Sequence, residues 1–230
     1  MGKPSLDPAL AAYRSLIAAR GELFGTPAGP AIEILTDEAE ISTTQRAVQE
    51  ARRRSGLAAD DVRVGVLLDD PYLLVMRDAV RFPDGALGLY NRIVSSPNVV
   101  ILPLLGDRVA LIHRFRHGTR SFHYEAPRGI ASGLDRLEDD ARRELKEEIG
   151  ADAVELIDLG ELHPYSGICN EMMRLYLARI TGVGAPELHE GITGIELFSV
   201  SALEAMIRDG VVTDAPTLAV TLRARLRNLL

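Results

Sequence analysis

The stretch EAPRGIASGLDRLEDDARRELKEEIGA, residues 125–151, carries the clearest pattern in this chain. An aliphatic residue recurs at every fourth position of its second half, which is the spacing of one face of an α-helix. We therefore predict a helix over about residues 138–149, with an apolar stripe that faces a core. The stripe is formed by Leu137, Ala141, Leu145 and Ile149.

Three glutamates border this apolar stripe on the same helix. Glu144 and Glu148 are four residues apart and Glu147 lies between them, so all three fall on one arc. Like charges at this spacing repel by about 0.2–0.5 kcal/mol per pair, and a bound cation would remove that cost. A site made of carboxylate oxygens suits Mg²⁺ or Mn²⁺ rather than zinc. The residues that face away, toward water, are Asp139, Arg142 and Lys146.

The same acids also fit an ordinary solvated helix face, on which Glu144 and Glu147 pair with neighbouring basic residues. Acidic side chains near a helix C-terminus interact unfavourably with the helix dipole. Helix stability alone would therefore not select Glu147 and Glu148 at this end. The spacing of a longer motif favours the metal-binding interpretation.

The segment resembles the Nudix box, in which a glycine precedes an Arg-Glu-aliphatic-x-Glu-Glu-x-Gly run at a fixed distance. Here the run is RELKEEIGA at 143–151. At residue frequencies of roughly 5–10 %, six identities at fixed spacing arise by chance on the order of once in 10⁷ starts. The pattern departs from the family at Asp135, where glutamate is usual, and Ala151 is a weak aliphatic. The identities are Gly129, Arg143, Glu144, Glu147, Glu148 and Gly150.

Within that superfamily the chain is similar to the ADP-ribose pyrophosphatase group. The matching segments are HRFR at 113–116, EAPRG at 125–129 and AMIRDGVVTDAPT at 205–217. Glu171 occupies the position of a glutamate that opens the strand after the box. The resemblance covers about residues 60–230.

The resemblance implies an α/β/α sandwich around a mixed sheet, with the box as a loop, a helix and a loop. It also implies a Mg²⁺ site, in which Mn²⁺ can substitute. Glu144 and Glu148 would be the principal ligands, and Glu147 would be a second ligand or would position a second metal or the water. The backbone carbonyl of Arg128 would be a further ligand. Arg143 would orient the carboxylates.

The resemblance further implies substrate contacts on the strand before the box. Arg116 would contact a phosphate, and Glu125 would form the site wall near Gly129. Arg114 is an additional substrate-binding candidate. Arg92 lies on a strand that would reach the site of a partner subunit.

A general base in this group lies on a loop before the last strand. The corresponding segment is GAPELHEGITGIELF at 184–198, with Glu190 as the first candidate and Glu187 as the second. Both acids also fit plain surface positions, so the assignment stays open.

Composition restricts the class of protein. The chain has 230 residues and a net charge of −7, which argues against broad nucleic-acid binding. Its apolar runs fall short of the about 20 residues that a membrane span needs, and the N-terminal MGKPSLDPAL lacks an apolar signal core. The single cysteine, Cys169, excludes an intramolecular disulfide framework. We therefore expect a cytoplasmic protein that binds neither membranes nor nucleic acid.

Turn signals and periodicity predict two parts. Residues 1–60 form a helical N-terminal extension, with helices that begin after Asp7 and after Ser42. Residues 61–230 form the Nudix hydrolase domain, with strands on both sides of one central helix, which indicates an α/β or α+β sandwich. We expect a loop between the last strand before the box and its helix. The predicted strands lie near 62–68, 72–76, 98–105, 108–115, 153–162, 172–180 and 194–200, and the closing helices near 201–209 and 215–228.

These patterns predict an enzyme that hydrolyses the pyrophosphate bond of a nucleoside diphosphate sugar with Mg²⁺. The favoured reaction converts ADP-ribose to AMP and ribose 5-phosphate. One alternative is hydrolysis of another nucleoside diphosphate derivative. Another is a catalytically silent Nudix-fold module that binds a nucleotide and regulates a partner, although the intact glutamates argue against it. The resemblance also implies a homodimer.

Overall fold

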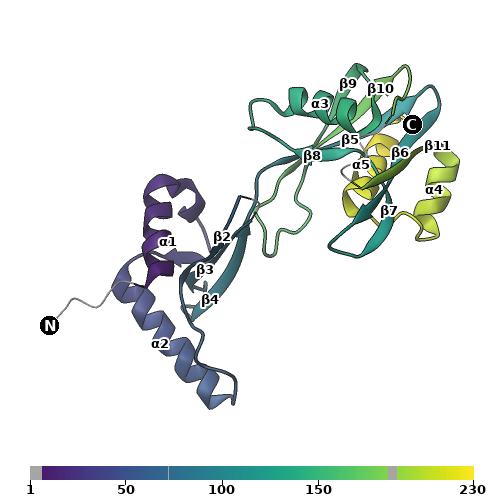
Figure 1. The fold of residues 1–230 in the computed structure, drawn as a ribbon. Coiled ribbons are helices and arrows are strands. Elements are labelled where there is room, and N and C mark those ends of the chain that lie inside the picture. The colour runs from purple at the N-terminus through teal and green to yellow at the C-terminus, as the bar shows by residue number, and fades with distance from the viewer. Residues whose placement is uncertain (1–6, 72, 186–190) are drawn as a thin grey trace. The chain divides into compact units, whose positions relative to one another are not determined.

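The computed structural model describes residues 7–71, 73–185 and 191–230 of the chain (Figure 1). The chain divides into two compact units. The first unit extends to Ser95 and includes Gly167–Asn170, and the second comprises Ser96–Ser166 and Glu171–Leu230. The predicted boundary between residues 60 and 61 therefore falls inside the first unit.

The first unit combines helices with a small antiparallel sheet, in which β3 pairs with β1, β2 and β4. Strands β2–β4 belong to this unit because α1 packs on β2 and α2 packs on β3 and β4. The short strand β1 lies in the segment that we expected to be helical. The elements are α1 (Pro8–Ala19), the 3₁₀ turn η1 (Gly21–Phe24), β1 (Glu33–Leu35), α2 (Glu38–Arg54), β2 (Gly65–Asp69), β3 (Leu74–Arg81) and β4 (Leu87–Val94).

Capping residues define where the first two helices begin. The side chain of Asp7 accepts a hydrogen bond from the amide of Ala9, which confirms the predicted start of α1. Helix α2 begins at Glu38, before the predicted start after Ser42. The reason is that the carboxylate of Asp37 accepts bonds from the first-turn amides and acts as the N-cap.

The second unit is built on one mixed sheet with the strand order β11-β6-β5-β10-β9. Strands β5 and β10 are parallel, and the other pairs in this path are antiparallel. Its strands are β5 (Asn98–Leu105), β6 (Arg108–Arg116), β7 (Ser121–Glu125), β8 (Arg128–Ile130), β9 (Ala153–Leu162), β10 (Met173–Ile180) and β11 (Ile192–Ser199), and its helices are α3 (Leu137–Ile149), α4 (Val200–Arg208) and α5 (Ala215–Leu226).

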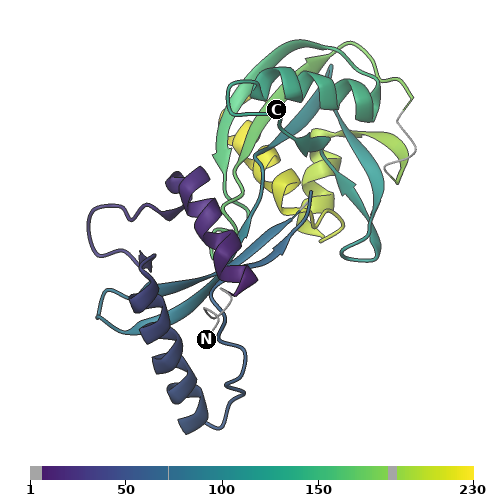
Figure 2. The same cartoon turned by 60° about the vertical axis from the view of Figure 1, so that its left-hand side comes forward.

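Helices cover both faces of this sheet (Figures 1 and 2). Helix α3 packs over β5 and β8, and its Leu145 lies in a core cluster with Ile101 of β5. Helices α4 and α5 pack on the other face, where Leu203 and Val220 join Leu102 in a second cluster. Alternate strand residues thus point to opposite layers. This arrangement confirms the predicted α/β/α sandwich around a mixed sheet.

The segment that we expected to be a loop contains two short strands. Strands β5 and β6 pair with each other only beside their connecting turn, at Leu104 with Val109 and Leu105 with Arg108. Beyond that point β8 pairs with β5 and β7 pairs with β6. The connection between β7 and β8, residues 126–127, therefore joins two diverging strands of the sheet. Strands of three and five residues are too short to show a clear alternation.

Glycine ends the box helix. Gly150 has a φ of 63° and occupies the left-handed C-cap position of α3, which a residue with a Cβ adopts at a cost. A Cβ at this position would also lie 2.8 Å from the Cα of Gly184. The last glycine of the motif is therefore explained by backbone geometry.

Among the described residues, no helix is long and apolar enough to cross a membrane.

Candidate active site

Helix α3 buries a row of acids beside its apolar stripe. Asp140, Glu144 and Glu148 recur every four residues, and their exposed fractions are 4 %, 6 % and 1 %. Glu147 is different, because its side chain is 42 % exposed. Two of the three predicted carboxylates are therefore buried against the sheet, and the third lies at the edge. The sequence analysis did not single out Asp140.

The backbone at the start of β8 lies directly against the buried glutamates. The amide of Arg128 donates a hydrogen bond to Glu148 Oε2 over 2.8 Å. A Cβ added at Gly129 would lie 2.0 Å from Glu144 Cδ, so a side chain here would displace the Glu144 carboxylate. The first glycine of the motif thus leaves room for this carboxylate against β8. The predicted ligands Glu144 and Glu148 therefore both lie against the backbone of Arg128 and Gly129.

Arginines neutralise these carboxylates in the structure. Arg114 of β6 contacts Glu148 Oε1 at 2.6 Å, and both side chains are almost completely buried. Arg143 contacts Glu144 at 2.8 Å and Glu147 at 2.7 Å. The charges of Glu144 and Glu147 raise the pKa of Arg143 although partial burial opposes this. Arg143 therefore pairs with two of the predicted acids.

A second ion pair joins β6 to β7. Arg116 contacts Glu125 through Nε, at 3.0 and 2.9 Å from the two oxygens, and through a terminal nitrogen at 2.5 Å. Burial acts to lower the pKa of Arg116. The hydrogen bond to Glu125 and the charges of Glu125, Asp214 and Glu148 outweigh this effect, so the pKa lies above its usual value. The Arg116 side chain keeps 28 % exposure, whereas Glu125 is buried.

Strand register places these groups on one face. Ile112 lies opposite Glu125, and Arg114 and Arg116 follow at alternate positions of β6. Side chains two residues apart point to the same side of a sheet. The side of Ile112 is the α3 side, because Ile112 lies in the same cluster as Leu145. The predicted substrate-binding residues Arg114, Arg116 and Glu125 therefore face the helix that carries the buried glutamates.

The N-terminus of α5 supplies further residues that the sequence analysis did not assign to the site. Asp214 contacts the guanidinium of Arg128 at 2.9 Å and caps the helix. Thr217, which is fully buried, accepts a bond from the amide of Ala126. Arg128 also lies 3.4 Å from Glu125. The signal was present in the DAPT of 214–217, which the sequence analysis did not connect with the site.

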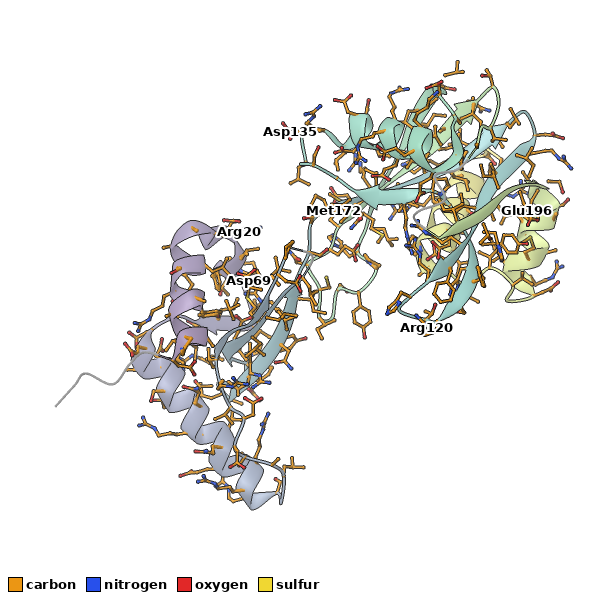
Figure 3. The ribbon with its side chains drawn as sticks, viewed as in Figure 1. Arg20, Asp69, Arg120, Asp135, Met172 and Glu196 are labelled. Carbon is orange, nitrogen blue, oxygen red and sulfur yellow. The ribbon has the colours of Figure 1, made fainter. Side chains whose placement is uncertain are left out.

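The buried Asp140 stabilises the loop before the box helix. Its carboxylate accepts bonds from the amide and the hydroxyl of Ser132, at 2.8 and 2.9 Å. Burial acts to raise the pKa of Asp140, but the Ser132 bonds and Arg143 lower it below its usual value. Asp135, where the motif departs from the family, lies on this loop and is exposed (Figure 3). Within the part of the chain that the structure describes, no hydrogen bond or ion pair joins its carboxylate to the acids of α3.

The remaining predicted residues lie elsewhere. Arg92 belongs to the first unit, where it contacts Asp78 at 2.5 Å and donates to the carbonyl of Leu23. Glu187 and Glu190, the candidates for the general base, lie outside the described residues. Within residues 7–71, 73–185 and 191–230, no three His, Cys, Asp or Glu side chains are gathered as a metal-binding group.

Comparisons with known proteins identify the family of this chain. The NUDIX domain family matches residues 94–219. Over 119 residues the chain is 31 % identical to an ADP-ribose pyrophosphatase of Mycobacterium tuberculosis (strain ATCC 25618 / H37Rv), which is 49 % of this chain and 56 % of the relative. Over 102 residues it is 28 % identical to the ADP compounds hydrolase NudE of Escherichia coli (strain K12), which is 44 % of this chain and 55 % of the relative.

A solved structure has the same fold. The crystal structure of an ADP compounds hydrolase superposes with a TM-score of 0.64 at 20 % identity, over 71 % of this chain and 90 % of that chain. At 20 % identity, this similarity is evidence for the fold alone. The chain spans about half the length of the curated relatives that it matches.

The sheet, the box helix and the glycine-to-glutamate contact define a Nudix fold, and the chain belongs to the NUDIX domain family. This confirms the resemblance on which the site residues were predicted. Nudix hydrolases generally use a divalent metal ion. The family match lies almost wholly in the second unit, which carries the box.

Proposed function

We propose that this protein hydrolyses the pyrophosphate bond of a nucleoside diphosphate sugar, and that ADP-ribose, cleaved to AMP and ribose 5-phosphate, is its substrate. The proposal includes Mg²⁺ dependence, a cytoplasmic location and a homodimer. It also keeps the predicted assignment of residues 61–230 to the hydrolase and of residues 1–60 to an extension. Relatives named as an ADP-ribose pyrophosphatase and an ADP compounds hydrolase support the substrate class.

One observation carries the proposal. Glu144 and Glu148 are buried on α3 against the Arg128–Gly129 backbone, and arginine side chains of β6 stand on the same face of the sheet. Burying carboxylates is costly unless charged partners neutralise them. A diphosphate bound with a divalent cation could replace these ion pairs. The cation would bind the glutamates, and the phosphate oxygens would bind the arginines.

The residues present fit a magnesium ion. Carboxylate and backbone oxygens, without sulfur or imidazole, are the donors that Mg²⁺ and Mn²⁺ prefer. Glu144 and Glu148 would hold the metal with the carbonyl of Arg128, and Glu147 would be a further ligand or would position the attacking water. When bound, a divalent metal neutralises phosphate charge and polarises water.

The protein side chains then have separate roles. Arg116 and Arg114 bind phosphate oxygens, and guanidinium groups suit this because they donate in a planar fork. Glu125 holds Arg116 in place. Arg143 orients the carboxylates of α3, with which it already pairs. Each of these groups is charged before substrate arrives, so little reorganisation is needed during the reaction.

Two roles depend on residues beyond this arrangement. Glu190, or in second place Glu187, would accept a proton from the attacking water. Arg92 would contact the substrate of a partner subunit, and its present partner Asp78 would then have to share it. Replacing Glu190 or Glu187 by glutamine should reduce turnover most for the true base.

The test is detection of AMP after incubation with ADP-ribose and Mg²⁺. GDP-mannose, UDP-glucose, NADH and dinucleoside polyphosphates complete the panel. We expect AMP from ADP-ribose, and a loss of about 100-fold or more in Glu148→Gln, because a ligand carboxylate is removed. Glu155→Gln is the control, since Glu155 is an exposed strand residue that pairs with Arg179.

The other outcomes separate the alternatives. Turnover of a different panel member would keep the chemistry and change the substrate. Absence of turnover by folded protein, with Mg²⁺ and with Mn²⁺, would contradict the proposal and favour the silent nucleotide-binding module. Equal activity of Glu148→Gln and Glu155→Gln would contradict the site assignment.

A further inference from the structure

Two residues at the N-terminus of α5, Asp214 and Thr217, contact the segment that connects β7 to β8. Asp214 is the N-cap of the helix, and its Oδ2 accepts from the amide and the hydroxyl of Thr217 at 3.0 and 2.7 Å. Because that hydroxyl donates its single proton to Asp214, its oxygen accepts from the amide of Ala126 at 2.9 Å. The other oxygen of Asp214 accepts from Arg128 at 2.9 Å.

Helix capping explains only part of this arrangement. An N-cap needs a side-chain oxygen that accepts from the first-turn amides, and Asp214 satisfies that need by its bond to the amide of Thr217. The bonds to Ala126 and Arg128 reach across to the sheet, 86 or more residues earlier in the chain. The bond to Ala126 holds the backbone of the connection, and the bond to Arg128 holds the side chain of the residue that follows it.

The same connection touches the predicted metal ligands. The amide of Arg128 donates to Glu148 Oε2, and Gly129 lies against the carboxylate of Glu144. The carbonyl of Pro127 accepts from the amide of Ile101 in β5. The position of the backbone beside Glu144 and Glu148 is therefore set by α5 on one side and by the sheet on the other.

We infer that Asp214 and Thr217 are positioning residues for the pyrophosphatase site. They act through the Ala126–Gly129 backbone, which they hold at the place where Glu148 and a carbonyl oxygen would bind the metal. This inference rests on the proposed function for its kinetic part. Neither side chain is assigned a contact with substrate, so their loss should change metal binding and kcat more than KM.

Helix α5 supplies its own matched control. Thr221 lies one turn after Thr217, is likewise buried, and its hydroxyl has no hydrogen-bond partner among the described residues. Thr217→Val and Thr221→Val thus remove the same atom from the same helix at similar burial. Only the first substitution breaks a connection to the β7–β8 backbone.

The experiment compares Thr217→Val, Thr217→Ser, Asp214→Asn and Thr221→Val with the wild type. Mn²⁺ binding is measured without substrate by the electron paramagnetic resonance of free Mn²⁺, and kcat and KM are measured with ADP-ribose. Removing a partner of a ligand-holding group commonly costs about 10- to 100-fold in metal affinity or activity. We expect such a loss of Mn²⁺ affinity and of kcat in Thr217→Val and Asp214→Asn, with KM within about twofold of wild type.

Thr217→Ser keeps the hydroxyl and should restore both quantities, and Thr221→Val should match the wild type. If Thr217→Val does not fold, Asp214→Asn against Asp209→Asn, an exposed aspartate at the end of α4, decides the question. Equal Mn²⁺ affinity and kcat in Thr217→Val and Thr221→Val would overturn the inference. If the wild type binds Mn²⁺ but hydrolyses nothing, the proposed function fails, and the Mn²⁺ comparison still decides the positioning role.

Discussion

Arg128 donates its backbone amide to Glu148 across 2.8 Å, which ties strand β8 to the box helix α3. The buried carboxylate of Glu148 thus accepts a hydrogen bond from a backbone amide that belongs to the sheet. The neighbouring Gly129 leaves no room for a side chain against Glu144. Together these contacts make the site depend on the distance between β8 and α3.

Adding a methyl group at Gly129 should displace Glu144. The added Cβ would lie 2.0 Å from Cδ and 2.2 Å from both carboxylate oxygens. We expect Gly129→Ala to lose stability by about 1–3 kcal/mol, as overpacked cores do. Activity should fall by about tenfold or more because a predicted ligand is moved. Gly118→Ala is the control, since nothing lies within 4 Å of a Cβ there. Indistinguishable melting temperatures and rates for the two variants would count against this account.

Removing Arg114 should leave the charge of Glu148 buried. Breaking one partner of a buried ion pair typically costs about 3–5 kcal/mol, whereas replacing both by apolar residues costs much less. We expect Arg114→Met to destabilise strongly and Arg114→Met with Glu148→Met to recover part of the loss. Urea unfolding of both single variants and the double variant measures the coupling.

Arg179→Met provides the comparison for this cycle. Arg179 also stands on a strand of the same sheet, but its pair with Glu155 is exposed. Exposed pairs contribute about 0–1 kcal/mol. A cost for Arg114→Met no larger than that for Arg179→Met would show that the buried pair is not a significant constraint.

Asp78 should be important for the stability of the first unit. Its buried carboxylate accepts from the hydroxyl of Tyr13 and contacts Arg92 at 2.5 Å. Burial, followed by the charge and hydrogen bond of Asp78, raises the pKa of Tyr13 far above its usual value, so the phenol stays protonated and donates. We expect Asp78→Asn to cost about 2–3 kcal/mol in thermal or urea unfolding, because hydrogen bonds to charged groups are strong. The exposed Asp60→Asn should change little, and an equal effect of both would refute this role.

Glu171 should make stability depend on pH. Burial raises the pKa of Glu171, although Arg128 and the hydrogen bond from Asn98 act in the opposite direction. A carboxyl with a raised pKa in the folded state stabilises the fold while it is protonated, and this contribution is lost as the pH rises through that pKa. The melting temperature of Glu171→Gln should therefore increase relative to wild type between pH 4 and pH 7. The exposed Glu161→Gln should show no such relative gain; a parallel pH profile for Glu171→Gln would contradict the burial argument.

Local patterns were sufficient for most elements of the second unit. The helix of the box follows from four apolar residues at helical spacing, and Gly150 ends it as a C-cap. The Gly106-Asp107 turn between β5 and β6 and the start of α5 after its cap Asp214 are local features of the same kind. Each of these features depends on residues within a few positions of one another, so no distant contact is needed to specify it.

Strands β7 and β8 were not predictable in the same way. They exist because β5 and β6 diverge and leave unpaired backbone groups on both, and buried backbone groups need partners. Similarly, the packing of α1 and α2 on strands β2–β4 joins segments far apart in the chain, and no local pattern specifies it. Pairing partners are a property of the whole sheet, and short strands carry little local signal.

The sequence by itself determined the family, the box helix and the identity of the acids that border its apolar face. The tertiary structure alone decided which of those acids are buried, that Arg114 and Arg116 pair with Glu148 and Glu125, and that Asp214 and Thr217 reach the β7–β8 connection. The physical reason is the separation in sequence over which each kind of interaction acts. Helical periodicity and capping act over one or two turns, whereas ion pairs and backbone contacts between residues far apart in sequence exist only after the sheet has brought them together.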